Sequence, residues 1–483
     1  MKEKSVFKNI LFNIIRVFLS VLFPLITFPY ISRVLMAENL GKVNYALSIE
    51  NYFALLAALG INTYAIREGA RRRNDKKQLE VFTNEIFTVN VITTIFAYIL
   101  LLIVVLANKA LHPYALLIGI QSLSIIFATI GIDWINSIFE DYFYITIRSF
   151  AIQIILLILM FLLVRTPDDY YIYTVLTVLS NGLCCILNFF YSRRYVKIHL
   201  VRKCRFFTHI KQLLVFFANN LAMNVYLNAD TTMLGYMIGD YVVGIYSVSV
   251  KIYNVIKAII AAIFTVCIPR LSAYYGNNCI KKYENLLNTV IGACTLLTFP
   301  MVTGLIVLAH PIVLIISGED YVQAASSLSI LSLGIIGAIF GGIATNCINI
   351  PMKRENYNLK ATVLAASINI ALNFVAIPIW KENGAAITTT IAEFTVLFCC
   401  ILTNKEFWKI VDIKSFTSNF WVSIVESMII IISAVLLGFV GLNIYIYIFI
   451  LVLVSGFSYT ILLLSSRNVL VVDLVHELYK NRK

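Results

Sequence analysis

The sequence predicts an all-α membrane protein with fourteen transmembrane helices, and three observations lead to this fold class. Hydrophobic residues make up 60% of the 483 residues and charged residues only 13%, which is not the balance of a soluble protein. Apolar runs long enough to cross a bilayer recur along the whole chain. Segments rich in Lys and Arg lie between them in the pattern of cytoplasmic loops.

The apolar runs define the fourteen helices in order. Each has about 20 residues or more, the length that a bilayer requires. They lie at 10–32, 42–65, 84–107, 113–132, 144–164, 170–191, 213–238, 242–268, 286–316, 324–350, 360–379, 384–403, 420–440 and 443–465. The first run is too long for a cleavable signal peptide and has no small-residue cleavage site, so we expect a spanning helix there.

The basic residues predict the orientation of the chain. Most of the 38 Lys and Arg residues fall on one side of this layout, with dense groups at 71–77 and 193–205. Short basic loops stay in the cytoplasm, so both the N-terminus and the C-terminus are expected there. The excess of basic residues in these loops accounts for the net charge of +13. A nucleic-acid partner is not indicated, because the basic loops are short and sorted by side.

A repeated stretch indicates a duplicated architecture. Tyr45-Ala-Leu-Ser-Ile-Glu-Asn-Tyr52 returns as Tyr246-Ser-Val-Ser-Val-Lys-Ile-Tyr253. On a helix, Glu50 or Lys251 then lies on a face of small or polar residues, with Ala46, Ala54 and Ala57 beside Glu50. The longest break in the apolar pattern is a basic segment. We therefore predict a six-helix lobe at 1–191, a cytoplasmic linker at 192–211, a second six-helix lobe at 212–404, and helices 13 and 14 with a cytoplasmic tail at 405–483.

Residues for enzymatic chemistry are scarce. No glycine-rich loop ending in Gly-Lys-Ser or Gly-Lys-Thr occurs, which argues against ATP hydrolysis. The five histidines have no partners at the spacing of metal ligands. The nine cysteines lie in helices or cytoplasmic loops of this layout, so no disulfide framework is indicated. We expect no enzymatic activity, no cofactor and no metal site.

Charges inside the predicted helices are the strongest functional signal. They are Arg16, Glu50, Asp230, Lys251, Lys257, Glu393 and Glu426. If all faced lipid, they would cost on the order of 20 kcal/mol in total, so they must face one another or a wet cavity. Both interpretations stay open.

The depth of each charge in the bilayer separates these interpretations. Asp230 and Lys251 lie at matching depths, which fits a structural pair. Arg16 and Lys257 lie at other depths and have no obvious carboxylate on an adjacent run. Such cations suit a cavity that recognises an anionic head group. Glu50 and Glu393 are candidates for proton or cation coupling, while Glu426 is expected to be structural.

Three stretches carry a resemblance to a known family. They are Leu25-Ile-Thr-Phe-Pro-Tyr-Ile-Ser-Arg-Val-Leu35 with Gly41, Asp230-Thr-Thr-Met-Leu-Gly-Tyr236 with Val243-Gly-Ile-Tyr246, and Asn369 to Gly384-Ala-Ala386. Together with the helix layout, they resemble the Wzx-type polysaccharide flippases of the multidrug and oligosaccharidyl-lipid exporter superfamily. Before Gly41 this chain has Leu35-Met-Ala-Glu, where that family usually has Leu-Gly.

The resemblance implies two pseudo-symmetric six-helix lobes around a central cavity that opens alternately to each side of the bacterial plasma membrane. The implied substrate is an undecaprenyl-diphosphate-linked oligosaccharide, which moves from the inner to the outer leaflet while its lipid tail stays among membrane lipid. A polysaccharide polymerase and other assembly proteins are the implied partners. The implied substrate-binding residues are Arg16, Arg33, Lys251 and Lys257, with Asp230, Glu50 and Glu393 in ion coupling or cavity pairing.

Two other functions stay open at this point. A cation-coupled multidrug or metabolite antiporter of the same superfamily usually lacks the helix pair after residue 418 and has an acidic cavity. A membrane glycan polymerase or acyltransferase needs a sizeable external segment and a cluster of catalytic side chains, and the sequence shows neither. Capsule, O-antigen and exopolysaccharide all stay open as the destination of the sugar repeat, and protons and sodium both stay open as the coupling ion.

Overall fold

The structure is a computed structural model that describes residues 6–139, 141–202, 206–404 and 410–466. All regular secondary structure in these ranges is helical. The chain divides into two compact units, Met1–Gly244 and Ile245–Lys483. Our division into lobes around a linker at 192–211 stays a prediction.

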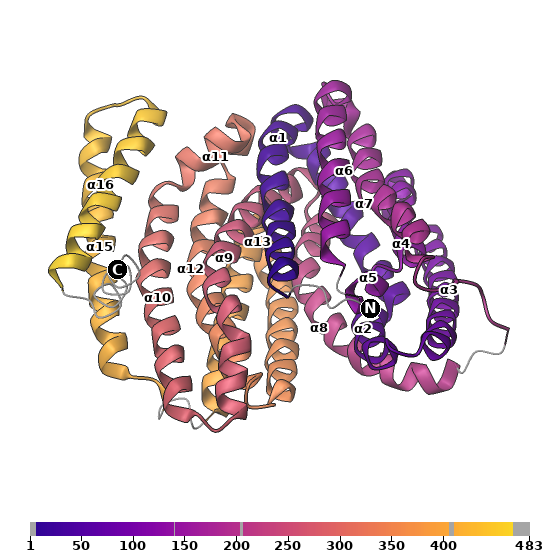
Figure 1. Ribbon diagram of the computed structural model, residues 1–483. Coiled ribbons are helices and arrows are strands. Elements are labelled where there is room, and N and C mark those ends of the chain that lie inside the picture. The colour runs from indigo at the N-terminus through magenta and orange to yellow at the C-terminus, as the bar shows by residue number, and fades with distance from the viewer. Residues whose placement is uncertain (1–5, 140, 203–205, 405–409, 467–483) are drawn as a thin grey trace. The chain divides into compact units, whose positions relative to one another are not determined.

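The first unit is built around one long helix (Figure 1). α1 packs against α3, α4, α6 and α8, while α4 packs against α7. The Glu50 copy of the repeated stretch therefore lies on the most central helix of this unit. The helices are α1 Val6–Ala58, α2 Ile61–Arg72, α3 Lys76–Ala107, η1 Lys109–Tyr114, α4 Ala115–Gly131, α5 Trp134–Ile138, α6 Tyr142–Leu163, η2 Pro167–Asp169, α7 Tyr170–Ser192 and α8 Phe206–Met237.

The second unit carries the other copy of the repeated stretch on its first helix. α12 packs against α13 and α10, α10 packs against α15, and α15 packs against α16; Figure 1 shows α15 and α16 side by side in yellow. The helices are α9 Asp240–Gly276, whose first turn belongs to the first unit, α10 Ile280–Val307, α11 Ala309–Ser317, η3 Glu319–Tyr321, α12 Ala324–Ile343, the π-helical η4 Ala344–Asn349, α13 Glu355–Thr403, α15 Ile413–Phe439 and α16 Ile444–Ser465.

Within the described residues, ten helices are long and apolar enough to cross a membrane. Each overlaps a predicted apolar run, and α13 contains two of them. The other runs, 10–32, 42–65 and 213–238, fall in α1, α2 and α8. The all-α membrane fold is thus confirmed, while the number of spans and the side of the termini stay predictions.

Two predicted loops are replaced by single non-helical residues. α1 is interrupted at Met36 (φ 62°, ψ 170°) and α13 at Lys381 (φ 50°, ψ −126°), so the gaps at 33–41 and 380–383 are otherwise helical. Both φ values lie in the left-handed region, which costs a residue other than glycine about 1–3 kcal/mol. Pro378 and Gly384 flank the break at Lys381, whereas no Gly or Pro lies within four residues of Met36.

The break in α13 folds its two halves against each other. A Cβ atom at Gly384 would lie 2.2 Å from the carbonyl oxygen of Ala376. Thr388 donates a hydrogen bond to Asn373 (2.5 Å), and both side chains are buried. Glycine is therefore required where the two helices come closest.

The predicted linker is packed along α3 over part of its length. α7 ends at Ser192 and α8 begins at Phe206. Between them, the His199 amide donates to Asn84 (3.0 Å) and the Val201 amide donates to Thr88 (3.0 Å). Side chains of α3 thus supply acceptors for backbone amides that no helix satisfies.

Candidate functional site

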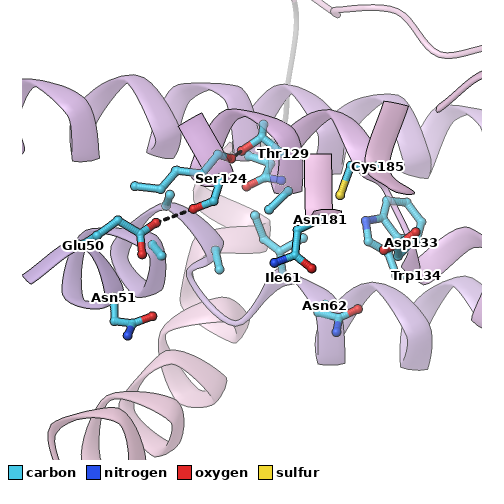
Figure 2. Close-up of a pocket in the computed structure, with 16 residues that line it drawn as sticks. Glu50, Asn51, Ile61, Asn62, Ser124, Thr129, Asp133, Trp134, Asn181 and Cys185 are labelled. Atoms are coloured by element: carbon cyan, nitrogen blue, oxygen red, sulfur yellow. Dashed lines mark hydrogen bonds between the residues drawn. The ribbon is translucent and has the colours of Figure 1, made fainter. Parts of the chain in front are cut away.

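A cavity of 420 Å³ lies in the first unit (Figure 2). Its lining comes from α1, α2, α3, α4, α5 and α7 and from the turn between α4 and α5. Small side chains on α1 and α4 leave the space, and polar side chains surround it. The described lining residues are Glu50, Asn51, Ala54, Ala57, Ala58, Ile61, Asn62, Asn90, Ser124, Ile125, Ala128, Thr129, Asp133, Trp134, Asn181 and Cys185.

Glu50 is the buried carboxylate of this cavity. The residue is only 2% exposed, and its carboxylate accepts a hydrogen bond from the Ser124 hydroxyl (2.6 Å). Ala54 and Ala57 line the cavity beside it, as the helical periodicity of the sequence predicts. Among the described residues no Lys or Arg pairs with Glu50. A carboxylate buried in this way is a ready acceptor for donors that enter the cavity.

Asn90 presents a second open acceptor. It is 9% exposed, and its Oδ1 atom has no hydrogen-bond partner among the described residues. Nearby lining residues are better satisfied, since Asn51 donates to Asn228 (3.2 Å) and Thr129 shares a hydrogen bond with Thr94 (2.7 Å). Because buried polar atoms are nearly always bonded, the free Asn90 oxygen points to a missing donor.

Asp133 and Trp134 close the other end of the cavity. Figure 2 shows Glu50 and Asp133 at opposite ends of the labelled residues. Arg148, which is only 6% exposed, donates from Nη2 to Asp133 Oδ1 (3.3 Å). The Asp133 side chain itself is 52% exposed, so it remains accessible while Arg148 balances its charge.

A second cluster of charges lies within the second unit. Lys257 of α9 forms an ion pair with Glu393 of α13 (2.5 Å), and the Tyr253 hydroxyl donates to the same carboxylate oxygen (2.6 Å). The sequence shows no obvious carboxylate on a run adjacent to that of Lys257, and its partner Glu393 comes from the distant run at 384–403. Depth in the bilayer does not predict this pair, because Glu393 is far away in the sequence and depth does not specify how each helix is rotated. Whether Lys257 also binds substrate stays a prediction.

The remaining predicted site residues have diverse surroundings. Arg33 is exposed on α1, Lys251 is half-buried on α9, and Asp230 is buried on α8. The side chain of Arg16 lies outside the described residues. Substrate binding by Arg16, Arg33 and Lys251, and coupling or pairing by Asp230, stay predictions.

Glu426 is buried in the helix pair that follows the second predicted lobe. Its carboxylate accepts hydrogen bonds from Ser458 of α16 (2.9 and 3.1 Å). It also lines a 230 Å³ space between α10, α15 and α16 whose other lining residues are mostly apolar. This geometry suits the structural role that we expected for Glu426.

Asn90, Ser124, Asp133 and Asn181 are parts of this site that were not predicted from the sequence. Asn90 and Ser124 are polar residues inside the predicted runs at 84–107 and 113–132, and that signal was available. Their presence with Glu50 in the lining of one cavity could not be predicted, because α1, α3, α4 and α7 meet only in the folded unit.

The family of this chain follows from its similarity to known proteins. Residues 6–275 match the family model described as polysaccharide biosynthesis protein. The chain belongs to this family. Residues 216–375 also match the MatE model. The resemblance stated from the sequence is therefore confirmed.

Relatives extend over most of the chain. A protein named as an O-antigen transporter of Shigella dysenteriae is 23% identical, covering 80% of this chain and 97% of the relative. The capsular polysaccharide biosynthesis protein CapF of Staphylococcus aureus is 25% identical, covering 81% and 97%.

Two solved structures share the fold of this chain. The lipid II flippase MurJ in an inward closed conformation aligns with a TM-score of 0.76 at 16% identity, covering 95% of this chain and 99% of MurJ. An inward-facing MATE family transporter aligns with a TM-score of 0.55 at 15% identity, covering 79% and 97%. The protein is a multi-pass membrane protein with a MurJ- and MATE-like fold.

Proposed function

We propose that this protein flips undecaprenyl-diphosphate-linked oligosaccharide repeat units from the inner to the outer leaflet of the bacterial plasma membrane. The observation that carries the proposal is membership of the polysaccharide biosynthesis family, with transporter-named relatives that align over about four-fifths of this chain. The flipped units serve the synthesis of a surface polysaccharide. The protein makes and breaks no bond, and it needs no cofactor.

The proposed mechanism is alternating access between two pseudo-symmetric lobes, 1–191 and 212–404. The linker at 192–211 connects the lobes on the cytoplasmic side, and helices 13 and 14 follow at 405–483. In this layout fourteen helices span the membrane and both termini are cytoplasmic. The lipid tail stays in the bilayer while the sugars cross through a charged interior.

The cations Arg16, Arg33, Lys251 and Lys257 are proposed to bind the diphosphate. Arg can hold phosphate oxygens in a bidentate manner, and Lys acts as a point charge. Lys257 pairs with Glu393 in this structure, so phosphate binding there would compete with the ion pair. Glu50, Asp230 and Glu393 are the proposed coupling or pairing carboxylates, and a polysaccharide polymerase with other assembly proteins would receive the product.

The leaflet distribution of the lipid-linked repeat tests this function. Cells depleted of the protein are treated with a sugar-reactive probe that reaches only the outer face. We expect the repeat units to accumulate on the inner leaflet, because the proposed route outward is lost. A normal distribution in depleted cells would contradict the proposal.

A cation-coupled antiporter is the second candidate, and one observation favours it. The described lining of the first-unit cavity contains Glu50 and Asp133 but no Lys, Arg or His, which suits a cationic substrate or ion. Residues 216–375 also match the MatE model. Depletion would then change sensitivity to cationic drugs and leave the leaflet distribution of lipid-linked sugars unchanged.

A further inference from the structure

The first-unit cavity combines carboxylates, amides, hydroxyls and one indole ring in a single lining. Glu50 and Asp133 supply acceptors, and four asparagines and two hydroxyl residues can both donate and accept. Trp134 adds an aromatic surface. The volume of 420 Å³ falls within the range of small-molecule sites.

The polar groups are arranged for an extended ligand and not for a single ion. Glu50 with Ser124 lies at one end of the cavity, Asp133 with Trp134 lies at the other, and Asn181 and Asn62 lie between them (Figure 2). The described residues contain no group of three or more His, Cys, Asp and Glu side chains that could hold a metal ion. A ligand with donors spread along its length matches this spacing.

Two acceptors in the cavity lack the donors that they need. Glu50 has one hydrogen bond, from Ser124, and no cation partner among the described residues. Asn90 Oδ1 has no hydrogen-bond partner among the described residues, although Asn90 is nine-tenths buried. Hydroxyl groups of a ligand would satisfy both, whereas an anionic group would face the Glu50 carboxylate.

We propose that this cavity binds an uncharged, hydroxyl-rich sugar of the translocated repeat unit and discriminates against acidic sugars. The assignment rests on the proposed flippase function and deepens it, because it separates a sugar subsite in the first unit from the cations proposed for the diphosphate. Glu50 and Asn90 accept sugar hydroxyls, and Trp134 lines the far end.

Trp134 offers a direct reporter of occupancy. In purified full-length protein, Trp380, Trp408 and Trp421 are replaced by Phe, so that Trp134 is the only tryptophan. Its fluorescence is titrated with glucose, galactose, mannose, N-acetylglucosamine and N-acetylgalactosamine, with glucuronate and galacturonate, and with NaCl. We expect a saturable change with at least one uncharged sugar and an affinity at least about tenfold lower for the uronates, because like charges repel.

Three substitutions and a matched control locate the effect. Glu50→Ala and Asn90→Ala should each weaken the uncharged sugar by about tenfold or more, since a site built for hydroxyls depends on its acceptors. Glu50→Gln should reduce the difference between uncharged and acidic sugars. Glu426→Gln removes the same charge in the second unit and should leave both affinities unchanged.

Three results would overturn the sugar subsite. They are a Trp134 response to NaCl without a response to any uncharged sugar, equal binding of uronates and uncharged sugars, and equal effects of Glu50→Gln and Glu426→Gln. The leaflet experiment separates the two proposals. Sugar binding with normal leaflet distribution would contradict only the flippase function, and inner-leaflet accumulation without sugar binding would contradict only the subsite.

Discussion

At the scale of single residues, the buried charges of the two units are satisfied in different ways. Glu50 relies on the Ser124 hydroxyl, whereas Glu393 has both the Lys257 ammonium and the Tyr253 hydroxyl. Helical periodicity was sufficient to place Glu50 among alanines. The pairing of Lys257 could not be predicted, because it depends on how α9 and α13 are rotated against each other.

The contribution of the Lys257–Glu393 pair to stability can be measured separately from any role in transport. Removing one partner of a fully buried pair costs about 3–5 kcal/mol, but 30% of the Lys257 side chain is exposed, so we expect Glu393→Gln to cost about 1–2 kcal/mol. Thermal unfolding of the purified protein measures this loss. An unchanged unfolding temperature would contradict the pairing.

The double variant Lys257→Met with Glu393→Leu tests whether Lys257 has a role in transport besides this ion pair. Replacing both charges with apolar groups of similar size should recover most of the stability, because no unpaired charge remains. We expect export of polysaccharide to stay impaired, since a proposed phosphate-binding cation and a proposed coupling carboxylate are both gone. Full export by this stable variant would show that Lys257 is only structural.

At the scale of elements, the helices follow from composition, but their junctions do not. In lipid each backbone group must be hydrogen-bonded within its own helix, so apolar length alone predicts where α3, α4, α6 and α7 lie. The interruptions of the apolar pattern at 33–41 and 380–383 predict loops there, but not that a single residue, Met36 or Lys381, makes each break. The extended helix expected at 286–316 is divided at Leu308, between α10 and α11.

Because the two halves of α13 pack closely at Gly384, a methyl group added there should destabilise the protein. Gly384→Ala would place a Cβ atom 2.2 Å from the Ala376 oxygen, and we expect a loss of about 1–3 kcal/mol from overpacking. At Gly438 of α15, no described atom outside the neighbouring backbone of its own helix lies within 4 Å of the Cβ position. Gly438→Ala should therefore be neutral or stabilising by up to about 1 kcal/mol. Equal unfolding temperatures for the two variants would contradict the packing.

The contact of the 193–202 segment with α3 can be tested by proteolysis. Asn84 is buried and bonds to His199 through both its amide oxygen and its amide nitrogen (3.0 and 3.2 Å). Asn84→Ala leaves the His199 amide without its acceptor, so we expect the segment to detach more often and trypsin to cleave faster after Arg193, Lys197 or Arg202. Cleavage at the wild-type rate would show that Asn84 does not hold the segment.

At the scale of the whole molecule, the membrane fold, the family resemblance and the face of α1 that lines the cavity could all be predicted from the sequence. The sequence was not sufficient for the cavity itself, since Asn90, Ser124, Asp133 and Asn181 come from four places in the chain. Hydrophobic periodicity predicts which face of a single helix is buried. A site formed by several helices can be predicted only when the packing of those helices is known.

The cationic interior proposed for transport gives a prediction for the intact protein. Arg16→Ala and Lys251→Ala should each abolish export while the amount of membrane-inserted protein stays unchanged, because the diphosphate loses a binding cation. Export assays with quantitative immunoblots measure both quantities. Wild-type export by both variants would contradict a cationic path for the substrate.

Flipping by the purified protein is the most direct test of the central claim. The protein is reconstituted into liposomes that carry undecaprenyl-diphosphate-linked oligosaccharide, and an impermeant enzyme outside the liposomes modifies the sugars that it can reach. We predict that the modified fraction rises from the outer-leaflet share to nearly all of the substrate. A modified fraction equal to that of protein-free liposomes, with folded protein present, would contradict the account.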